Sequence, residues 1–165
     1  MLAGIDEAGF GPVLGPLCVV AVAVEGEAAA VEDGLRAVGV RDSKLAYAGG
    51  RLAGLEALAL AGITWLTGWT PATAAELFAL AGEGEAERSA PWQAGAAACR
   101  RPLTATLVPA WRLDRLRPLA LAGRILHPLA LNAAARAGLN RAGAEAAAVV
   151  ALLQDLPRRP GTGAG

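Results

Sequence analysis

Hydrophobic positions in the first 25 residues fall into two short runs separated by a turn-forming segment. Leu2–Ile5 is apolar and ends at two acidic residues, and the stretch 9–16 that follows is dense in glycine and proline. This pattern predicts a strand that runs into a turn. Leu17–Val24 is almost continuously apolar and rich in valine, which predicts a buried strand. We expect the two strands to pair as a hairpin.

Helical spacing follows the hairpin. Alanine, valine and leucine recur at helical intervals over residues 27–38, and Gly39 is a suitable C-terminal cap. A second helix is predicted over residues 51–60, where the leucines share one face and Gly62 ends the pattern.

The next elements are predicted from alternation and capping signals. Residues 63–69 alternate bulky apolar side chains with threonine and glycine, which predicts a third strand. Thr70 followed by Pro71 predicts the start of another helix.

The second half of the chain has a weaker pattern. Between residues 82 and 118 glycine, proline and charge are mixed, and only 103–108 resembles an edge strand. Residues 119–156 are predicted to be mainly helical, with breaks near Pro128, Gly138 and Gly143. A length of 165 residues suits one domain, which we expect over 1–156, followed by a disordered tail over 157–165.

Composition narrows the classes of function. Fifteen basic residues balance fifteen acidic ones, so no overall cationic field favours nucleic acid, and any such binding must be local. Cys18 and Cys99 are far apart, which argues against a disulfide framework or a zinc site. Every apolar run is interrupted before it could span a bilayer, and no targeting segment is visible, so we expect a cytoplasmic protein that does not bind membranes.

Two adjacent carboxylates, Asp6 and Glu7, stand where the first strand ends. Such a pair is costly to bring together unless solvent, a proton or a cation relieves the repulsion. Hard divalent ions bind carboxylate and water oxygens, so the pair is a candidate half of a metal site for phosphodiester cleavage. The alternative is a solvated turn with no ligand.

The glycines after the carboxylates favour close approach of a ligand to the main chain. Gly9 and Gly11 allow conformations that a Cβ would forbid, and Pro12 and Pro16 stiffen the turn. Main-chain amides at this turn are therefore candidates for contact with a ribose or a phosphate. A plain turn between two strands is the alternative reading.

Two motifs in order resemble one known family. Residues 4–16 read Gly-Ile-Asp-Glu-Ala-Gly-Phe-Gly-Pro followed by a second Gly-Pro, and Asp42-Ser43-Lys44 comes after the next predicted helix. Both are similar to motifs of the ribonuclease HII family, and residues 124–137 are similar to the helix before that family's third acidic strand. The resemblance implies an α/β, ribonuclease H-like fold, in which helices flank a mixed sheet that is incomplete at its C-terminal end.

The resemblance also implies a reaction and a cofactor. Members of the family hydrolyse the RNA strand of RNA–DNA hybrids, or a ribonucleotide embedded in a DNA duplex, with bound Mg²⁺ or Mn²⁺. Asp6 and Glu7 match the first two metal-binding acids, and they are therefore the expected catalytic residues.

Five further residues match substrate-binding positions of the family. Gly9, Phe10 and Gly11 match the loop that senses the ribose 2′-hydroxyl, which distinguishes RNA from DNA at one position. Ser43 and Lys44 match positions that contact the backbone phosphate. A helix cap and a surface cation are the alternatives for these two residues.

The sequence also departs from the family pattern. Phe10 stands where typical bacterial members have arginine, which removes a phosphate contact. The family needs two later aspartates, and the second half offers only Asp114 and Asp155, neither in the family's Asp-Gly context. A fragment or shortened member is the leading interpretation. The alternatives are a non-catalytic remnant that binds nucleic acid and a small protein-interaction domain.

Overall fold

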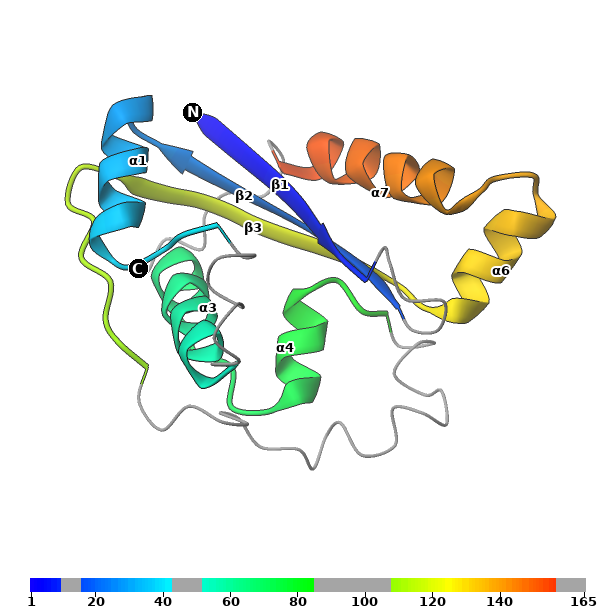
Figure 1. The fold of residues 1–165 in the computed structure, drawn as a ribbon, viewed down its shortest axis with the longest axis horizontal. Coiled ribbons are helices and arrows are strands. Elements are labelled where there is room, and N and C mark those ends of the chain that lie inside the picture. Colours follow the sequence, from blue (N-terminus) through cyan, green and yellow to red (C-terminus); the bar gives the residue numbers. More distant parts are fainter. Residues whose placement is uncertain (10–15, 43–51, 85–107, 157–165) are drawn as a thin grey trace.

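Three antiparallel strands form the sheet at the centre of the structure, a computed structural model that describes residues 1–9, 16–42, 52–84 and 108–156 (Figure 1). The strands are β1 (Leu2–Ala8), β2 (Leu17–Glu25) and β3 (Arg117–Leu126), in the order β1-β2-β3. Leu2 pairs with Val24 and Ala8 with Cys18, so the predicted hairpin is confirmed. Among the described strands β1 has one partner, and its other edge is open.

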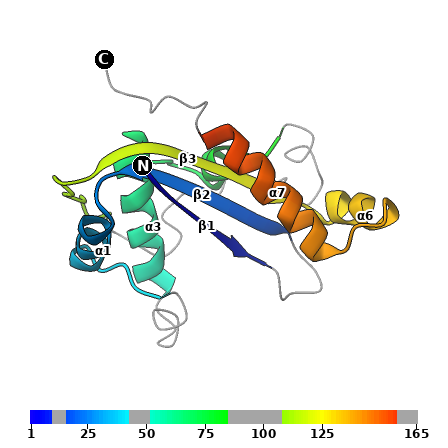
Figure 2. The ribbon, with the colours of Figure 1, turned by 90° about the horizontal axis from the view of Figure 1, so that it is seen from above.

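One face of the sheet is covered by a C-terminal helix, α7 (Arg141–Asp155) (Figure 2). Alternate residues of β2, beginning with Leu17 and Val19, are fully buried on this face. They pack with Ala120 and Ala122 of β3 and with Leu152 of α7. Period-two burial of apolar residues explains why this segment is a strand, and the small alanines on β3 allow close packing of the helix.

The opposite face carries α1 (Ala28–Ala37), α3 (Leu52–Thr67) and α4 (Ala74–Leu80) (Figures 1 and 2). The end of α4 lies directly on β3, where a Cβ added at Gly82 would be 2.0 Å from the Gly123 carbonyl oxygen. Gly82 also has a φ of +80°, which L side chains rarely adopt. The segment after α4 and strand β3 therefore pack with their main chains in direct contact, at Gly82 and Gly123. The last helix, α6 (Pro128–Arg136), connects β3 to α7.

The predicted strand over residues 63–69 is wrong, because α3 continues to Thr67. The threonines fit the helix by donating to the preceding turn: Thr64 Oγ1 donates to the Leu60 carbonyl at 2.7 Å, and Thr67 Oγ1 to the Ile63 carbonyl at 2.8 Å. Gly62 does not end the helix. Its missing Cβ makes room for the Trp111 ring, which would lie only 3.0 Å from such an atom.

The expected helix over residues 119–126 is also wrong, since these residues belong to β3. Leucine and alanine are strong helix formers, but pairing with β2 satisfies the main chain of this segment and buries alternate side chains. Helix resumes at Pro128 and breaks at Gly138, as expected, whereas Gly143 lies inside α7. The Gly143 amide donates to the side chain of Asn140, the N-cap, at 2.8 Å.

Helix α4 begins later than predicted. Thr70 and Pro71 precede it, and the N-cap is Thr73, whose side chain accepts from the Glu76 amide at 3.2 Å. The Glu76 carboxylate in turn accepts from the Thr73 amide at 3.0 Å, which completes a capping box. The two reciprocal hydrogen bonds between Thr73 and Glu76 stabilise a helix start at Thr73, and not at Thr70 as the sequence predicted.

The α/β class predicted from the sequence is confirmed, with helices on both faces of the sheet. Within the described ranges the sheet is antiparallel throughout, so a parallel strand of the expected mixed sheet is not among them. The candidate edge strand at 103–108, except for its last residue, and the tail 157–165 lie outside the described residues. No helix that the structure describes is both long and apolar enough to cross a membrane.

Candidate metal and nucleic-acid site

The two adjacent carboxylates lie near the end of β1, one of the two edge strands of the described sheet. Asp6 and Glu7 are both exposed, and the Glu7 amide donates to Asp6 Oδ1 at 3.0 Å. Among the described strands, the backbone edge of β1 beside the two carboxylates is also open. Exposed carboxylate oxygens are the donors that Mg²⁺ and Mn²⁺ favour, so the chemistry of this pair fits a hard divalent ion.

Strand geometry separates the two side chains. Asp6 is opposite Val20 and Glu7 is opposite Val19, and neighbouring residues in a strand point to opposite faces. Asp6 therefore lies on the face that carries α3 and α4, and Glu7 on the face that carries α7. A single ion bound by both carboxylates would have to lie at the open edge of β1, beside the strand.

The turn after β1 requires a glycine. Gly9 has a φ of +92°, and a Cβ at this position would lie 2.3 Å from the Pro16 carbonyl oxygen. The Gly9 carbonyl accepts a hydrogen bond from Nη2 of Arg141, the first residue of α7. Gly9 therefore has the special backbone conformation that the sequence predicted. Arg141 was not predicted, because nothing in the local sequence relates it to a residue 132 positions away.

The remaining predicted substrate-binding residues lie outside the described ranges. These are Phe10, Gly11, Ser43 and Lys44. Their predicted contacts with a ribose or a phosphate stay predictions.

The two later aspartates do not join the carboxylate pair. Asp155, at the end of α7, forms an ion pair with Arg124 of β3. Asp114 is exposed in the turn before β3. Within the described ranges, no group of three or more His, Cys, Asp or Glu side chains is arranged to hold a metal ion. The pair Asp6 and Glu7 is therefore the candidate metal-binding element.

A buried polar pair lies at the same end of the sheet. Nε2 of His127, which follows β3, is 2.9 Å from Oε1 of Glu83, which follows α4, and both side chains are buried. Burial raises the pKa of the nearby Cys18 thiol, and the negative charge of Glu83 raises it further. The thiol therefore stays protonated at neutral pH and is neither a nucleophile nor a ready metal ligand.

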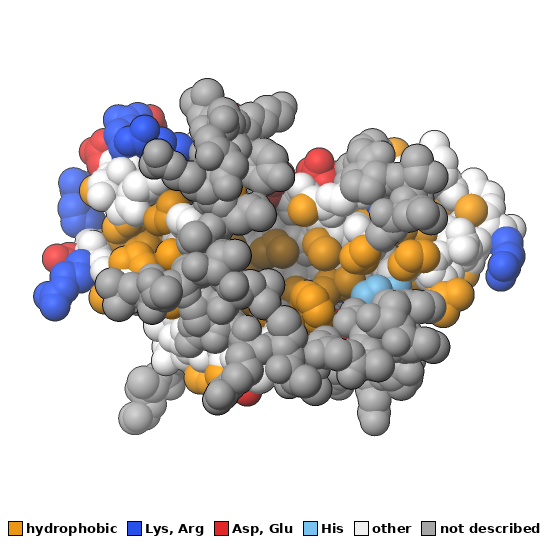
Figure 3. Space-filling model, turned by 60° about the horizontal axis from the view of Figure 1, so that its bottom comes forward, with side chains coloured by type: hydrophobic (Ala, Val, Ile, Leu, Met, Phe, Trp, Pro, Cys, Tyr) orange, Lys and Arg blue, Asp and Glu red, His pale blue; other side chains and the backbone are white. Residues whose placement is uncertain are grey.

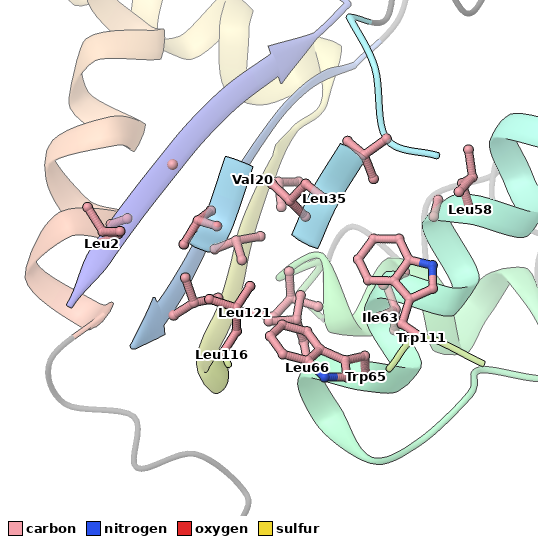
Figure 4. Close-up of a pocket in the computed structure, with 18 of the residues that line it drawn as sticks. Leu2, Val20, Leu35, Leu58, Ile63, Trp65, Leu66, Trp111, Leu116 and Leu121 are labelled. Carbon is pink, nitrogen blue, oxygen red and sulfur yellow. The ribbon is translucent and has the colours of Figure 1, made fainter. Parts of the chain in front are cut away.

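A large apolar cavity separates the sheet from α1 and α3, with a volume of about 840 Å³. Figure 3 shows apolar side chains gathered around a hollow in the molecule, and Figure 4 shows leucine and tryptophan side chains of the strands and helices around it. Trp65 and Trp111 pack at its side with ring centroids 6.5 Å apart. Such a lining suits apolar groups and not a phosphate. The cavity is compatible with the interaction-domain alternative, which stays a prediction.

Comparison with known proteins agrees with the resemblance seen in the N-terminal motifs. The ribonuclease HII family matches residues 3–51. Ribonuclease HII of Methanosarcina acetivorans is 52% identical over 44 residues, and that of Methanocaldococcus jannaschii is 54% identical over 44 residues. Each match covers 27% of this chain and 18% of the relative. No solved structure matches the chain significantly.

The matched segment contains all the predicted site residues. Residues 3–51 include both carboxylates, the turn at Gly9 and the Asp42-Ser43-Lys44 motif. They also include β2 and α1, whereas α3, α4, β3, α6 and α7 lie beyond the match. The resemblance to ribonuclease HII is therefore established for the N-terminal third of the chain.

Proposed function

Because residues 3–51 match ribonuclease HII, we propose that this chain is a metal-dependent endoribonuclease domain. Its substrate is the RNA strand of an RNA–DNA hybrid, or a ribonucleotide embedded in a DNA duplex. One observation supports this most directly: Asp6 and Glu7 are exposed at the end of an edge strand, next to a left-handed glycine turn, within the matched segment.

In this proposal Asp6 and Glu7 hold Mg²⁺ or Mn²⁺ at the open edge of β1. Two carboxylates are sufficient protein ligands for Mg²⁺ in many sites, where water and substrate phosphate supply the other oxygens. When bound, the ion supplies Lewis-acid stabilisation of the charge that develops on the phosphate oxygens during hydrolysis.

The chain's own residues bind and orient the substrate. Main-chain groups of Gly9, Phe10 and Gly11 contact the ribose 2′-hydroxyl, because the glycines have no side chain that would block its approach. This contact selects RNA over DNA. Ser43 and Lys44 hold the neighbouring backbone phosphate by a hydroxyl donor and a positive charge.

The test is cleavage of a duplex that contains one ribonucleotide, with Mg²⁺ or Mn²⁺ supplied. Asp6→Asn and Glu7→Gln are each expected to lower kcat/KM by about 100-fold or more, since even outer-shell changes at metal sites cost about 10- to 100-fold. Asp33→Asn, which removes an exposed carboxylate from α1, is the control and is expected to keep full activity. Unchanged cleavage by Asp6→Asn would remove these carboxylates from the mechanism.

Whether the two carboxylates share one ion is decided by a double-mutant cycle. Mn²⁺ affinity is measured calorimetrically for the wild type, both single variants and the double variant. Ligands of one ion give strongly non-additive losses, whereas independent carboxylates give additive losses. Additive losses would contradict a shared ion at the edge of β1.

A second function is favoured by one observation, the lack of a three-residue ligand group within the described ranges. In this alternative the chain is a non-catalytic module that binds hybrids through the Gly9 turn. It predicts hybrid binding that weakens steeply with salt, without cleavage in either metal. The cleavage assay, run beside a binding titration, separates the two functions.

A further inference from the structure

The Gly9 carbonyl accepts a hydrogen bond from a residue in the second half of the chain, beyond the family match. Arg141 Nη2 donates to the Gly9 carbonyl, in a half-buried contact between residues 132 positions apart. The family match ends at residue 51, so this contact joins α7 to the proposed site independently of the resemblance.

Both partners of this contact are packed against other parts of the chain. Gly9 has a left-handed backbone with a φ of +92°, and the Pro16 carbonyl oxygen lies 2.3 Å from the position that a Cβ would take. Arg141 begins a helix whose start is capped by Asn140 and whose body is anchored on the sheet by the fully buried Leu152. A side chain carried by an anchored helix therefore meets main chain that is itself closely packed at Gly9.

The chemistry of the contact favours a durable link. An arginine guanidinium is always protonated, and its hydrogen bond to a carbonyl is charge-assisted. Loss of the donor would leave the half-buried Gly9 carbonyl without this partner, which destabilises the conformation that points the carbonyl toward α7.

We propose that Arg141 is a positioning residue: it holds Gly9, and with it the end of β1 that carries Asp6 and Glu7, in the geometry that receives the substrate. The identity of the substrate rests on the proposed function above. The holding of the turn rests on the Arg141 contact alone.

The first experiment measures amide hydrogen exchange along the hairpin, which does not depend on activity. Arg141→Met is expected to accelerate exchange about tenfold at residues 7–9 and 17–19, next to the turn, and to leave residues 2–4 and 22–24 unchanged. Arg141→Lys, which retains a charged donor, is expected to restore most of the protection. Arg136→Met, which replaces an exposed arginine of α6, is the control. Uniform acceleration along the ladder, or none, would overturn the proposal.

The second experiment measures function. Arg141→Met is expected to raise the KM for the ribonucleotide-containing duplex about tenfold, with a smaller change in kcat, and Arg141→Lys is expected to rescue it. Unchanged KM and kcat in Arg141→Met would show that the turn needs no positioning, which also overturns the proposal. If the wild type neither cleaves nor binds the duplex, the proposed function fails, and hydrogen exchange still decides whether Arg141 holds the turn.

Discussion

At the scale of single residues, the glycines of this chain have unequal roles. Gly82 combines a φ of +80° with a main-chain contact to β3 that leaves no space for a side chain. Gly54, near the start of α3, has no atom within 4 Å of the position that a Cβ would take. The sequence alone does not distinguish the two glycines, because the space available for a side chain depends on the atoms that pack against each of them.

Gly82→Ala is expected to destabilise the fold by at least about 2 kcal/mol, because backbone strain and a clash with the Gly123 carbonyl add together. Gly54→Ala is the matched control, and it should be neutral or stabilising by up to about 1 kcal/mol, since alanine favours helix. Urea unfolding of both variants measures the difference. Equal stabilities would contradict the close approach of α4 to β3.

The buried pair of His127 and Glu83 gives a second prediction at the residue scale. Glu83→Ala is expected to cost about 3 kcal/mol in the free energy of unfolding, because it removes the buried carboxylate 2.9 Å from the buried imidazole Nε2 of His127. Glu83→Gln keeps an acceptor oxygen and should cost clearly less. Equal losses in the two variants, measured by denaturant unfolding, would argue against the hydrogen bond to His127.

At the scale of elements, the short helix α4 is stabilised mainly by the contacts at its two ends. Helix α4 has seven residues, none of them buried, so its own packing supplies little stability. Its capping box at Thr73 and its main-chain contact with β3 hold it in place. Because a helix this short is unstable alone, its position is decided by these two contacts.

Thr73→Ala is therefore expected to destabilise the protein by about 1 kcal/mol, the usual cost of removing an N-cap. Thr73→Ser retains the accepting oxygen and should remain close to the wild type. Thermal or urea unfolding compares the two variants. A loss with serine as large as that with alanine would mean that packing of the threonine methyl, and not the cap, is responsible.

Helix α7 illustrates the opposite case, an element stabilised by one buried face. Leu152 is fully buried against the sheet, whereas its neighbour Leu153 is 49% exposed. Leu152→Ala is expected to cost about 2 to 5 kcal/mol, and Leu153→Ala less than about 1 kcal/mol. Because the two changes are chemically identical, unequal free energies of unfolding test the orientation of the helix directly.

At the scale of the whole molecule, α7 connects the two halves of the chain. Arg141 at its start contacts the turn after β1, and Asp155 at its end pairs with Arg124 of β3. The helix therefore extends from the proposed site to the far edge of the described sheet (Figure 2). We expect function and stability to be coupled through this helix.

The sequence by itself determined the elements whose signals are local. The hairpin of β1 and β2 follows from two apolar runs around a Gly/Pro turn, and α1 follows from helical spacing closed by Gly39. The carboxylate pair and the left-handed Gly9 could also be predicted, because adjacent acids and a glycine turn are visible in consecutive residues.

Tertiary structure decided what depends on distant partners. Residues 63–67 are helical although they alternate, because Trp111 packs on α3. Residues 119–126 form a strand although leucine and alanine favour a helix, because β2 pairs with β3. Strand pairing likewise put Asp6 and Glu7 on opposite faces, and only folding brought Arg141 to Gly9. Local sequence encodes conformational preference, whereas hydrogen bonding and burial between distant segments provide the larger free energies that choose among the alternatives.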